Sequence, residues 1–348
     1  MAAESKTRAM LADMFIKCLD ENTLPWTKNW NTDHKPFEDR NYTTGKKYRG
    51  VNKLLLEVMA QESGYASNDW MTNIQARKLG YYVKKGDHGV PIEYFNYIDK
   101  NENKEISQTE FYTRKASSNP DVRDSCYQLL KISTVFNVCQ FPKLKEELEK
   151  ELAEKYEAEK DRPVVHDKIS YPEYAEMILK KYCENEGIEL DIAYSNDACY
   201  YDPQNDRVVV PHRNKVHSTE EYLHNLCHEI AHSTMKEERL NRNAHGNFGS
   251  PEYATEELRA EIAASFLLAD FGVPMTGLLE DSKSYVKDWS QKIKEDHKVL
   301  IDAIKDAEKI TGYVKEKGEY DRIVEKQKTS EQRLTRPLPA QRRRGRGR

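Results

Sequence analysis

Apolar residues recur at helical spacing near the start of the chain and in strand-like clusters further on. Residues 5–21, 52–63 and 72–79 carry apolar side chains every three or four positions, which predicts three helices. Aromatic and β-branched side chains then dominate three short stretches, namely residues 91–98, 111–114 and 127–138. Such a composition predicts strands. We therefore predict a small α+β domain whose three strands form an antiparallel sheet.

A charged segment follows this part of the chain. Residues 143–162 are dense in Lys and Glu at helix-pair spacing, and Leu144, Leu148, Leu152 and Tyr156 recur every four residues. This apolar stripe is narrow and shorter than the three heptads that a coiled coil requires. An exposed helix that tethers two domains is therefore favoured over a dimerising helix.

The back half of the chain mixes both patterns again. Residues 171–186 predict an amphipathic helix, Thr219 is the expected cap of another, and residues 253–271 are apolar almost all round, which indicates a buried helix. Two closing helices are predicted at residues 282–292 and 295–315. Three strands precede Thr219, and they are residues 188–194, 198–201 and 207–210. The back half is therefore also predicted to be α+β.

These patterns divide the 348 residues into four parts. We predict a front domain at residues 1–143, a charged helical linker at 144–166, a back domain at 167–318 and a disordered basic tail at 319–348. The tail ends in Arg-Arg-Arg-Gly-Arg-Gly-Arg. Because phosphate attraction is independent of sequence, we favour nucleic-acid binding over a solubilising role for this tail.

The net charge of −4 is distributed unevenly. Residues 1–143 carry +3, residues 144–330 carry −13 and residues 331–348 carry +6, which predicts different partners for different parts. The six cysteines are scattered without a C-x-x-C pair, as expected for reduced thiols. No apolar run approaches the roughly 18 residues of a membrane span, and the start of the chain lacks the apolar core of a secretory signal. We expect a cytoplasmic protein without a membrane partner.

The strongest chemical signal is the H-E-x-x-H motif of residues 228–232. Positions four apart lie on one face of a helix, so His228 and His232 can bind one metal ion. Glu229 beside them is the candidate catalytic base, because a carboxylate there can accept a proton from water. The competing interpretation is a surface helix with two solvated histidines, and the apolar opposite face of the helix argues against it.

A catalytic zinc ion takes three protein ligands and leaves one position for water. Glu257 and Glu261 share a stripe of an otherwise apolar helix, and buried carboxylates require partners. We assign Glu257 as the third ligand and Glu261 as the group that orients a ligand histidine. Four other residues remain candidates for the third ligand, namely His212, His224, His245 and Glu256. Of these, His224 is interpreted as a supporting or surface residue. The competing interpretation pairs the two glutamates with Arg239, Arg242 or Arg259. The expected cofactor is Zn²⁺, with Mn²⁺ or another divalent ion as the alternative.

Strands followed by an H-E-x-x-H helix resemble the layout of zincin metallopeptidases. The spacing of Glu257 and Glu261 also resembles the E-x-x-x-D pattern of glutamate-ligand zincins, with Glu in place of Asp. In such proteins an edge strand can hold an extended peptide by strand addition. Residues 207–210 are our candidate for that strand.

Aromatic and cationic residues are interleaved in residues 22–52, which include Trp26 and Trp30. Rings can stack on the bases of single-stranded DNA while Lys and Arg follow its phosphates. The competing interpretation is that the rings are core and the cations are solvated surface. Composition alone does not decide between them.

Five stretches in this front part follow one another in a specific order. Residues 42–52 read Tyr-Thr-Thr-Gly-Lys-Lys-Tyr-Arg-Gly-Val-Asn, and the others are residues 24–26, 70–76, 83–92 and 135–140. On these stretches, residues 10–141 resemble the N-terminal single-stranded-DNA-binding domain of ArdC-type antirestriction proteins, which also occurs in plasmid TraC-type primases. The resemblance implies DNA binding without identifying the contacts. From ring or charge combined with loop placement, we predict contacts by Tyr42, Lys46, Lys47, Tyr48, Arg49, Lys84 and Lys85.

Residues 171–316 resemble the zincin-like metallopeptidase domain of the same family. The stretches that carry the resemblance are residues 227–234, 239–242, 253–261 and 284–289. In one respect the chain departs from the family, which has Thr-Gly-His after the second histidine where this chain has Thr234-Met235-Lys236. The departure removes a polar histidine near the site and leaves the three assigned ligands unchanged.

The leading hypothesis is a metal-dependent peptidase of a plasmid, phage or other mobile element that binds single-stranded DNA. The resemblance implies that it protects incoming DNA from restriction, for example during conjugation, and DNA-bound proteins are candidate substrates. The alternative is a DNA-coating protein whose metal site is structural or unused. An accessory factor of a primase ranks last, because the sequence has no P-loop and no carboxylate cluster for nucleotidyl transfer.

Overall fold

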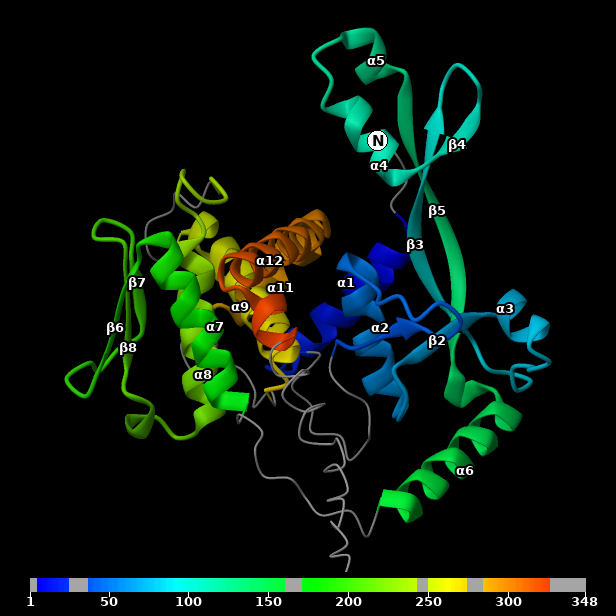
Figure 1. Cartoon of the computed structure of the whole chain (residues 1–348), viewed down its shortest axis with the longest axis horizontal. Helices are drawn as coiled ribbons and strands as arrows, with labels where there is room; N and C mark the ends of the chain where they lie inside the picture. Colours follow the sequence, from blue (N-terminus) through cyan, green and yellow to red (C-terminus); the bar gives the residue numbers. More distant parts are fainter. Residues whose placement is uncertain (1–4, 25–36, 160–170, 243–249, 274–283, 326–348) are drawn as a thin grey trace, which may run out of the picture.

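The computed structural model describes five stretches of the chain, namely residues 5–24, 37–159, 171–242, 250–273 and 284–325. Trp26, Trp30, His245 and residues 326–348 lie outside these stretches, and so do the predictions made for them. The start of the predicted disordered tail lies inside them and differs from the prediction: residues 320–325 are helical, because Tyr320 packs on the core and donates to the Asp270 carbonyl at 3.0 Å. Helices and strands occur in both halves (Figure 1), which confirms the predicted α+β class.

The front half contains a five-stranded sheet. Its strand order is β1-β2-β5-β3-β4, in which β1 and β2 are parallel and the other neighbours are antiparallel. The strands are β1 (Arg40–Asn41), β2 (Asp69–Thr72), β3 (Val90–Asp99), β4 (Lys104–Ile106) and β5 (Cys126–Asn137). Strands β3 and β5 were expected from the sequence. The other three have only two to four residues, too few for an alternating pattern to be recognised.

The three predicted helices of the front half are present and have clear end signals. Helix α2 stops at Gly64, which adopts a left-handed conformation with φ of 64°. Helix α3 begins with a capping box in which the side chains of Thr72 and Gln75 each accept a backbone N–H of the other. The three helices are α1 (Lys6–Asp20), α2 (Gly50–Ser63) and α3 (Asn73–Lys78).

The predicted strand at residues 111–114 is wrong, because these residues belong to helix α4 (Gln108–Lys115). Ser107 caps this helix by accepting the N–H of Glu110 at 3.1 Å, and Phe111 supplies its buried side chain. The neighbouring aromatic residues resemble a strand in composition. The cap at Ser107 and the burial of Phe111 alone among these residues favour a helix instead.

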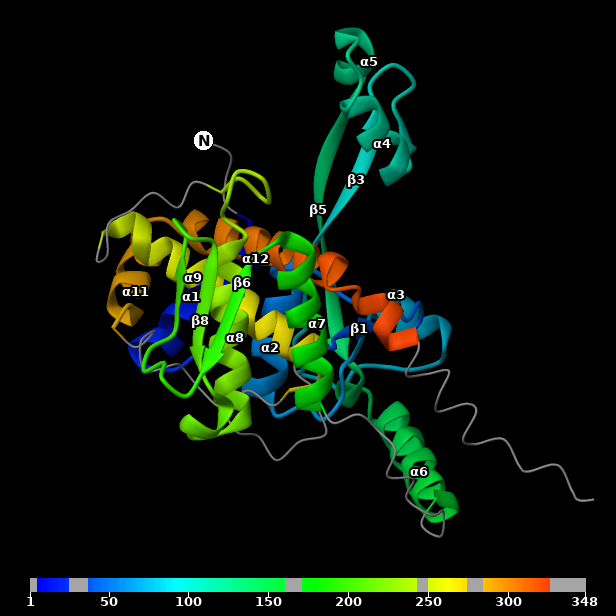
Figure 2. The same ribbon diagram turned by 60° about the vertical axis from the view of Figure 1, so that its left-hand side comes forward.

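Strands β3 and β5 extend beyond the rest of the sheet as a long two-stranded ribbon (Figures 1 and 2). Its far end carries β4, α4 and helix α5 (Pro120–Asp124). We call this projection, residues 94–131, the arm. The predicted charged helix follows β5 as α6 (Pro142–Glu159), in which Lys150 Nζ lies 2.8 Å from Glu146 Oε1.

The back half contains a three-stranded sheet with the order β6-β8-β7, in which β6 is parallel and β7 antiparallel to β8. The prediction of residues 207–210 as an edge strand is wrong. Strand β8 (Arg207–Pro211) is central, and the edges are β6 (Glu189–Ala193) and β7 (Tyr200–Asp202). The three consecutive valines of β8 are buried, as is typical of a strand covered on both faces.

Helix α8 (Thr219–Ser233) carries the H-E-x-x-H motif. Its cap is Ser218 rather than the predicted Thr219, and the Ser218 hydroxyl accepts the N–H of Glu221 at 3.1 Å. Ser and Thr are both favoured cap residues, and the extended backbone at Ser218 identifies it as the cap. The other helices of this half are α7 (Tyr171–Glu186), α9 (Pro251–Asp270), α11 (Val286–Glu295) and α12 (Lys298–Lys317).

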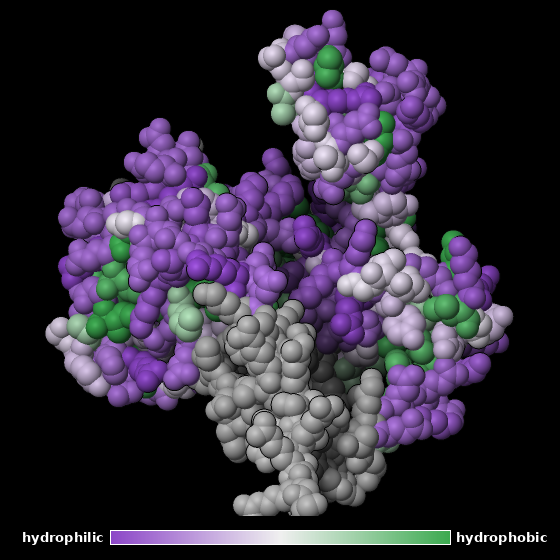
Figure 3. Space-filling model, viewed as in Figure 1, coloured by the Kyte–Doolittle hydropathy of each residue, from purple (hydrophilic) through white to green (hydrophobic). Residues whose placement is uncertain are grey.

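The two halves share one hydrophobic core. Leu11 and Leu55 from the front half belong to the same cluster of buried side chains as Phe266 and Ile304 from the back half. Helix α1 packs against α11, and α2 packs against α12. The Lys53 ammonium lies 4.0 Å from the centre of the Phe266 ring. Around this core the visible surface is largely hydrophilic, with hydrophobic residues gathered over α3 and over the β6–β8 sheet (Figure 3).

Candidate metal centre and nucleic-acid surface

Helices α8 and α9 bring three predicted ligands together in a buried site. His228 Nε2 lies 3.2 Å from Glu257 Oε2, and His232 Nε2 lies 3.4 Å from Glu257 Oε1. The two Nε2 atoms are 3.1 Å apart. One donor atom of each residue therefore lies within 4.8 Å of the others, close enough to bind a single ion.

The outer nitrogen of each histidine faces a second carboxylate. His228 Nδ1 lies 3.4 Å from Glu261 Oε2, and His232 Nδ1 lies 3.4 Å from Glu256 Oε1. A carboxylate at Nδ1 favours the tautomer with its proton on that nitrogen. The lone pairs of both Nε2 atoms then point toward the same place.

Four buried carboxylates surround the two histidines, namely Glu229, Glu256, Glu257 and Glu261. Burial alone would lower the pKa of His228 and of His232, but hydrogen bonds to these carboxylates outweigh it. They raise the pKa of His228 well above its usual value and that of His232 to about 9. The same contacts lower the pKa of Glu257 although burial opposes them. The site favours positive charge at its centre, so its residues fit a divalent cation that replaces protons.

The alternative ligand His224 is buried one turn before His228, with its Nε2 atom 3.1 Å from Glu261 Oε1. It therefore supports the carboxylate that holds His228 and does not join the three converging donors. The sequence left open whether His224 is a supporting residue or a surface residue, and its burial shows that it is not on the surface.

Arginine pairing distinguishes Glu256 from Glu257. Arg242 Nη1 donates to both oxygens of Glu256 at 2.8 and 2.6 Å, and Arg259 lies 3.6 Å from the same carboxylate. Arg242 Nη2 also donates to the Ala231 carbonyl of α8 at 2.9 Å. The arginines thus neutralise Glu256 and leave Glu257 facing the histidines. The link from Arg242 to His232 through Glu256 was not expected, because Arg242 and Glu256 are 14 residues apart and no helical spacing relates them.

Glu229 lies beside the edge strand β7. Burial raises the pKa of Glu229, and the backbone N–H of Tyr201 donates a hydrogen bond to its carboxylate. Tyr253 lies one turn before Glu257 on α9, and burial together with the charge and hydrogen bonding of Glu257 raises the pKa of Tyr253. The Tyr253 hydroxyl therefore adjoins the converging donors, a position that sequence analysis missed although the i, i+4 spacing signals it.

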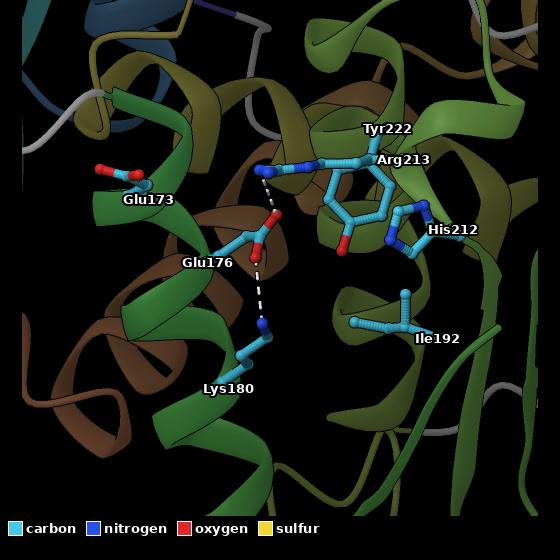
Figure 4. A pocket seen from close by; sticks show the side chains of 7 residues that line it. All are labelled: Glu173, Glu176, Lys180, Ile192, His212, Arg213 and Tyr222. Atoms are coloured by element: carbon cyan, nitrogen blue, oxygen red, sulfur yellow. Dashed lines mark hydrogen bonds and ion pairs between the residues drawn. The ribbon is translucent and has the colours of Figure 1, made fainter.

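A cavity of about 470 Å³ lies between α7 and the start of α8 (Figure 4). Glu176 sits between two cations there, 3.0 Å from Lys180 Nζ and 3.8 Å from Arg213 Nη1. The alternative ligand His212 lines this cavity and stacks on Tyr194 with ring centres 4.1 Å apart. The three converging donors do not line it, so His212 and the cavity belong to a separate place.

The predicted DNA contacts lie on two loops around one small core. Tyr42 from the first loop and Val83 from the second both pack on the cluster that includes Met71 and Phe141. Burial raises the pKa of Tyr42 and of Tyr48, whose ring packs against the main core. Both rings are partly buried, so they offer less surface for stacking than the sequence suggests.

The predicted cations differ in their pairing. Lys47 Nζ lies 2.6 Å from Glu38 Oε1. Lys46, Arg49, Lys84 and Lys85 are exposed, and none of these four forms an ion pair with another residue in the described stretches. An unpaired cation can bind a phosphate without losing a protein partner. The structure thus favours these four over Lys47.

Comparison with known protein families defines the class of protein to which this chain belongs. Residues 179–306 match the zincin-like metallopeptidase family, and residues 5–136 match the N-terminal domain of the anti-restriction factor ArdC. The chain therefore combines an ArdC-type front half with a zincin-like back half, and it belongs to the family of ArdC-type antirestriction proteins. This confirms the resemblance found in the sequence.

Two solved structures of the antirestriction protein ArdC from plasmid R388 have this fold. The metal-free structure shares 24% identity with a TM-score of 0.62 and covers 91% of this chain and 99% of its own. The Mn(II)-bound structure shares 25% identity with a TM-score of 0.62 and covers 89% and 97%. A DNA primase TraC of Escherichia coli is 32% identical over 311 residues, which are 87% of this chain and 26% of the primase. The chain thus spans about a quarter of that relative. Within the described stretches, no helix has the length and apolarity to cross a bilayer.

Proposed function

We propose that this chain is a metal-dependent peptidase that binds single-stranded DNA and protects the incoming DNA of a mobile element from restriction in the cytoplasm. The observation that carries the peptidase part is the convergence of His228, His232 and Glu257 beside Glu229 in a buried site. The antirestriction part is supported by the solved relatives, which are described as plasmid antirestriction proteins.

His228, His232 and Glu257 would hold the ion through two imidazole nitrogens and one carboxylate. This set suits Zn²⁺ and leaves a position for water, and Mn²⁺ is the alternative because a solved relative is described as Mn(II)-bound. A divalent ion supplies Lewis acidity, which polarises a carbonyl and lowers the pKa of water. Glu261 and Glu256 would keep the Nδ1 protons in place, so that both Nε2 atoms stay directed at one point.

The chain's own groups then divide the work of peptide hydrolysis. Glu229 would accept a proton from the attacking water and pass it to the leaving amine. Its raised pKa brings it closer to neutral pH, which helps both transfers. The Tyr253 hydroxyl, beside Glu257, is the candidate donor to the developing oxyanion. Strand β7, adjacent to Glu229 through Tyr201, replaces residues 207–210 as the candidate peptide-binding edge.

Calorimetric titration of the metal-stripped full chain with MnCl₂ and ZnCl₂ tests the metal centre. We expect binding at one site in the wild type and binding weakened at least about a hundredfold in His228→Ala, because a ligand is lost. His212→Ala is the matched control, since His212 lies at the separate cavity. Unchanged affinity in His228→Ala would refute the assignment.

Glu229→Gln separates this proposal from its rival, a DNA-coating protein with a structural or unused metal site. The variant keeps the shape of the side chain and removes the base. In a conjugation assay with a restricting recipient, we expect protection to be lost. Protection that survives in Glu229→Gln but disappears in a Lys84→Gln, Lys85→Gln variant would show that DNA coating is sufficient. A primase-accessory role stays the last alternative, because the chain spans a quarter of the primase it resembles.

A further inference from the structure

Helix α3 and the loop after it expose three large hydrophobic side chains. Ile74 is 70% exposed, Leu79 is 49% exposed and Tyr82 is 68% exposed. Gly80 adopts a positive φ of 82° and turns the chain, so that Tyr81 packs inward on the small core while Tyr82 remains outside. In Figure 3 hydrophobic residues gather at the surface where Figure 1 places α3. Such a patch on a polar surface indicates a binding site.

Cations surround this patch without protein partners. Arg77, Lys78, Lys84 and Lys85 are exposed, and none of the four pairs with an acidic residue in the part of the chain that the structure describes. Residues 73–86 contain no Asp or Glu. Arg40 on the neighbouring strand β1 differs from these four, because its guanidinium lies 2.8 Å from the carboxylate of Asp69. The patch therefore carries a concentrated positive charge that is available to an anionic partner.

The patch is joined to the first DNA-binding loop. Gln75 Nε2 of α3 donates to Thr43 Oγ1 at 2.6 Å, and Asn41 Nδ2 donates to Gln75 Oε1 at 3.2 Å. The loop so attached carries Lys46 and Arg49, which also have no ion pair with a described residue. Six exposed cations without an ion pair to a described residue thus lie on α3, on the loop after it and on the loop bonded to α3. We call residues 74–85 the α3 surface.

We propose that the α3 surface is the base-contacting part of the single-stranded DNA site, with Tyr82 stacking on a base and Ile74 and Leu79 contacting its neighbours. This inference rests on the proposed function. Arg77, Lys78, Lys84 and Lys85 hold the phosphates on either side. Single-stranded DNA fits because it presents apolar base faces and phosphates within one nucleotide, whereas a duplex buries its base faces. An apolar protein partner would leave the cations unmatched.

Fluorescence anisotropy with a labelled 20-nucleotide oligo(dT) and the full chain tests this assignment. We expect Tyr82→Ala to weaken binding about tenfold, the usual effect of removing a stacking ring. Tyr82→Phe keeps the ring and retains wild-type affinity. Tyr112→Ala is the matched control, because Tyr112 is 54% exposed on the arm. Tyr82 is exposed, so its replacement leaves the thermal unfolding midpoint unchanged.

The outcomes separate the two proposals. If the wild type does not bind the oligonucleotide, the DNA part of the proposed function fails. If the wild type binds and Tyr82→Ala binds equally well, the α3 surface is refuted and DNA binding stands. Concentration-dependent self-association that Tyr82→Ala abolishes, with DNA affinity unchanged, would instead identify a protein-binding surface and overturn the assignment. Loss of binding in Tyr82→Ala but not in Tyr82→Phe supports stacking.

Discussion

The candidate metal centre and the α3 surface differ in whether their charged side chains have partners of opposite charge. In the metal centre every predicted ligand faces an opposite charge, and His232 lies 3.4 Å from both Glu256 and Glu257. On the α3 surface, cations such as Lys84 and Lys85 face water. A buried charge without a partner costs several kcal/mol, whereas an exposed one keeps its hydration. We therefore expect single changes to abolish function at the centre and to reduce it gradually at the surface.

The largest effect on metal binding should come from Glu257, and the neighbouring residue Glu256 provides the comparison. Glu257→Gln removes a donor that faces both histidines, so we expect Mn²⁺ affinity to fall at least about a hundredfold in calorimetry. Glu256→Gln leaves the three donors in place and disturbs only the support of His232, which typically weakens metal binding about 10–100-fold. If Mn²⁺ affinity falls more in Glu256→Gln than in Glu257→Gln, Glu256 is the ligand and Glu257 the supporting residue.

Replacing Arg242 should lower the free energy of unfolding in addition to weakening metal binding. Arg242→Met leaves the buried Glu256 carboxylate without its main cation, and breaking a buried pair costs about 3–5 kcal/mol. We expect a loss of about that size in the free energy of unfolding, measured by urea titration. Replacing both partners, as in Arg242→Met with Glu256→Gln, removes the unpaired charge and should recover part of the loss. No recovery would mean that Arg242 acts through its bonds to α8 instead.

A smaller effect should distinguish two neighbouring lysines among the proposed DNA contacts. Lys46 is unpaired among the described residues, whereas Lys47 contacts Glu38 at 2.6 Å. Lys46→Gln should reduce the slope of log affinity against log salt concentration by about 0.7, as expected for one lost phosphate contact with a single strand. Lys47→Gln should change it less. Equal slopes for the two variants would show that pairing does not decide which cations bind DNA.

The smallest effect concerns an ion pair far from both regions. On the arm, the N–H of Glu102 and the guanidinium of Arg114 lower the pKa of Asp99 to about 2, below its ordinary 3.8. Because the folded pKa is the lower one, the stabilisation is complete above pH of about 4 and is lost as the pH falls toward 2. Urea midpoints at pH 5 and pH 3 should therefore differ more in the wild type than in Asp99→Asn. If the difference in urea midpoint between pH 5 and pH 3 is the same in both proteins, Asp99 does not contribute to the pH dependence of stability.

The positions of the proposed metal ligands could be predicted from the sequence more closely than the exposure of the proposed DNA contacts, for a physical reason. His228 and His232 are four residues apart on α8, as Glu257 and Glu261 are on α9, and spacing on a helix determines which side chains share a face. The choice between Glu256 and Glu257 needed the structure, because Arg242 decides it from a loop. Local rules encode contacts within a helix and not contacts across a loop.

The proposed DNA surface depends on the exposure of each side chain and on ion pairs between separate segments, which a linear sequence does not contain. Tyr42 and Tyr82 are the same residue type in the sequence, but Tyr42 packs on a core and Tyr82 is exposed. Lys46 and Lys47 differ only in that Glu38 is near one of them. The fold errors have a similar origin, since residues 111–114 have a strand-like composition and the position of residues 207–210 within the sheet depends on pairing between distant segments.

The shared core has a consequence for how this chain can change over evolutionary time. The Phe37 ring meets the Phe266 ring edge-on at 4.9 Å, and Lys53 lies over the same ring, so residues of the front half cover the helix that carries Glu257. Recombination that joined a front half to a back half from a distant relative would mismatch this contact and expose apolar surface. We therefore expect the two halves to be inherited together, and a chimera of distant halves to become soluble only when the residues on both sides of Phe266 are exchanged as a set.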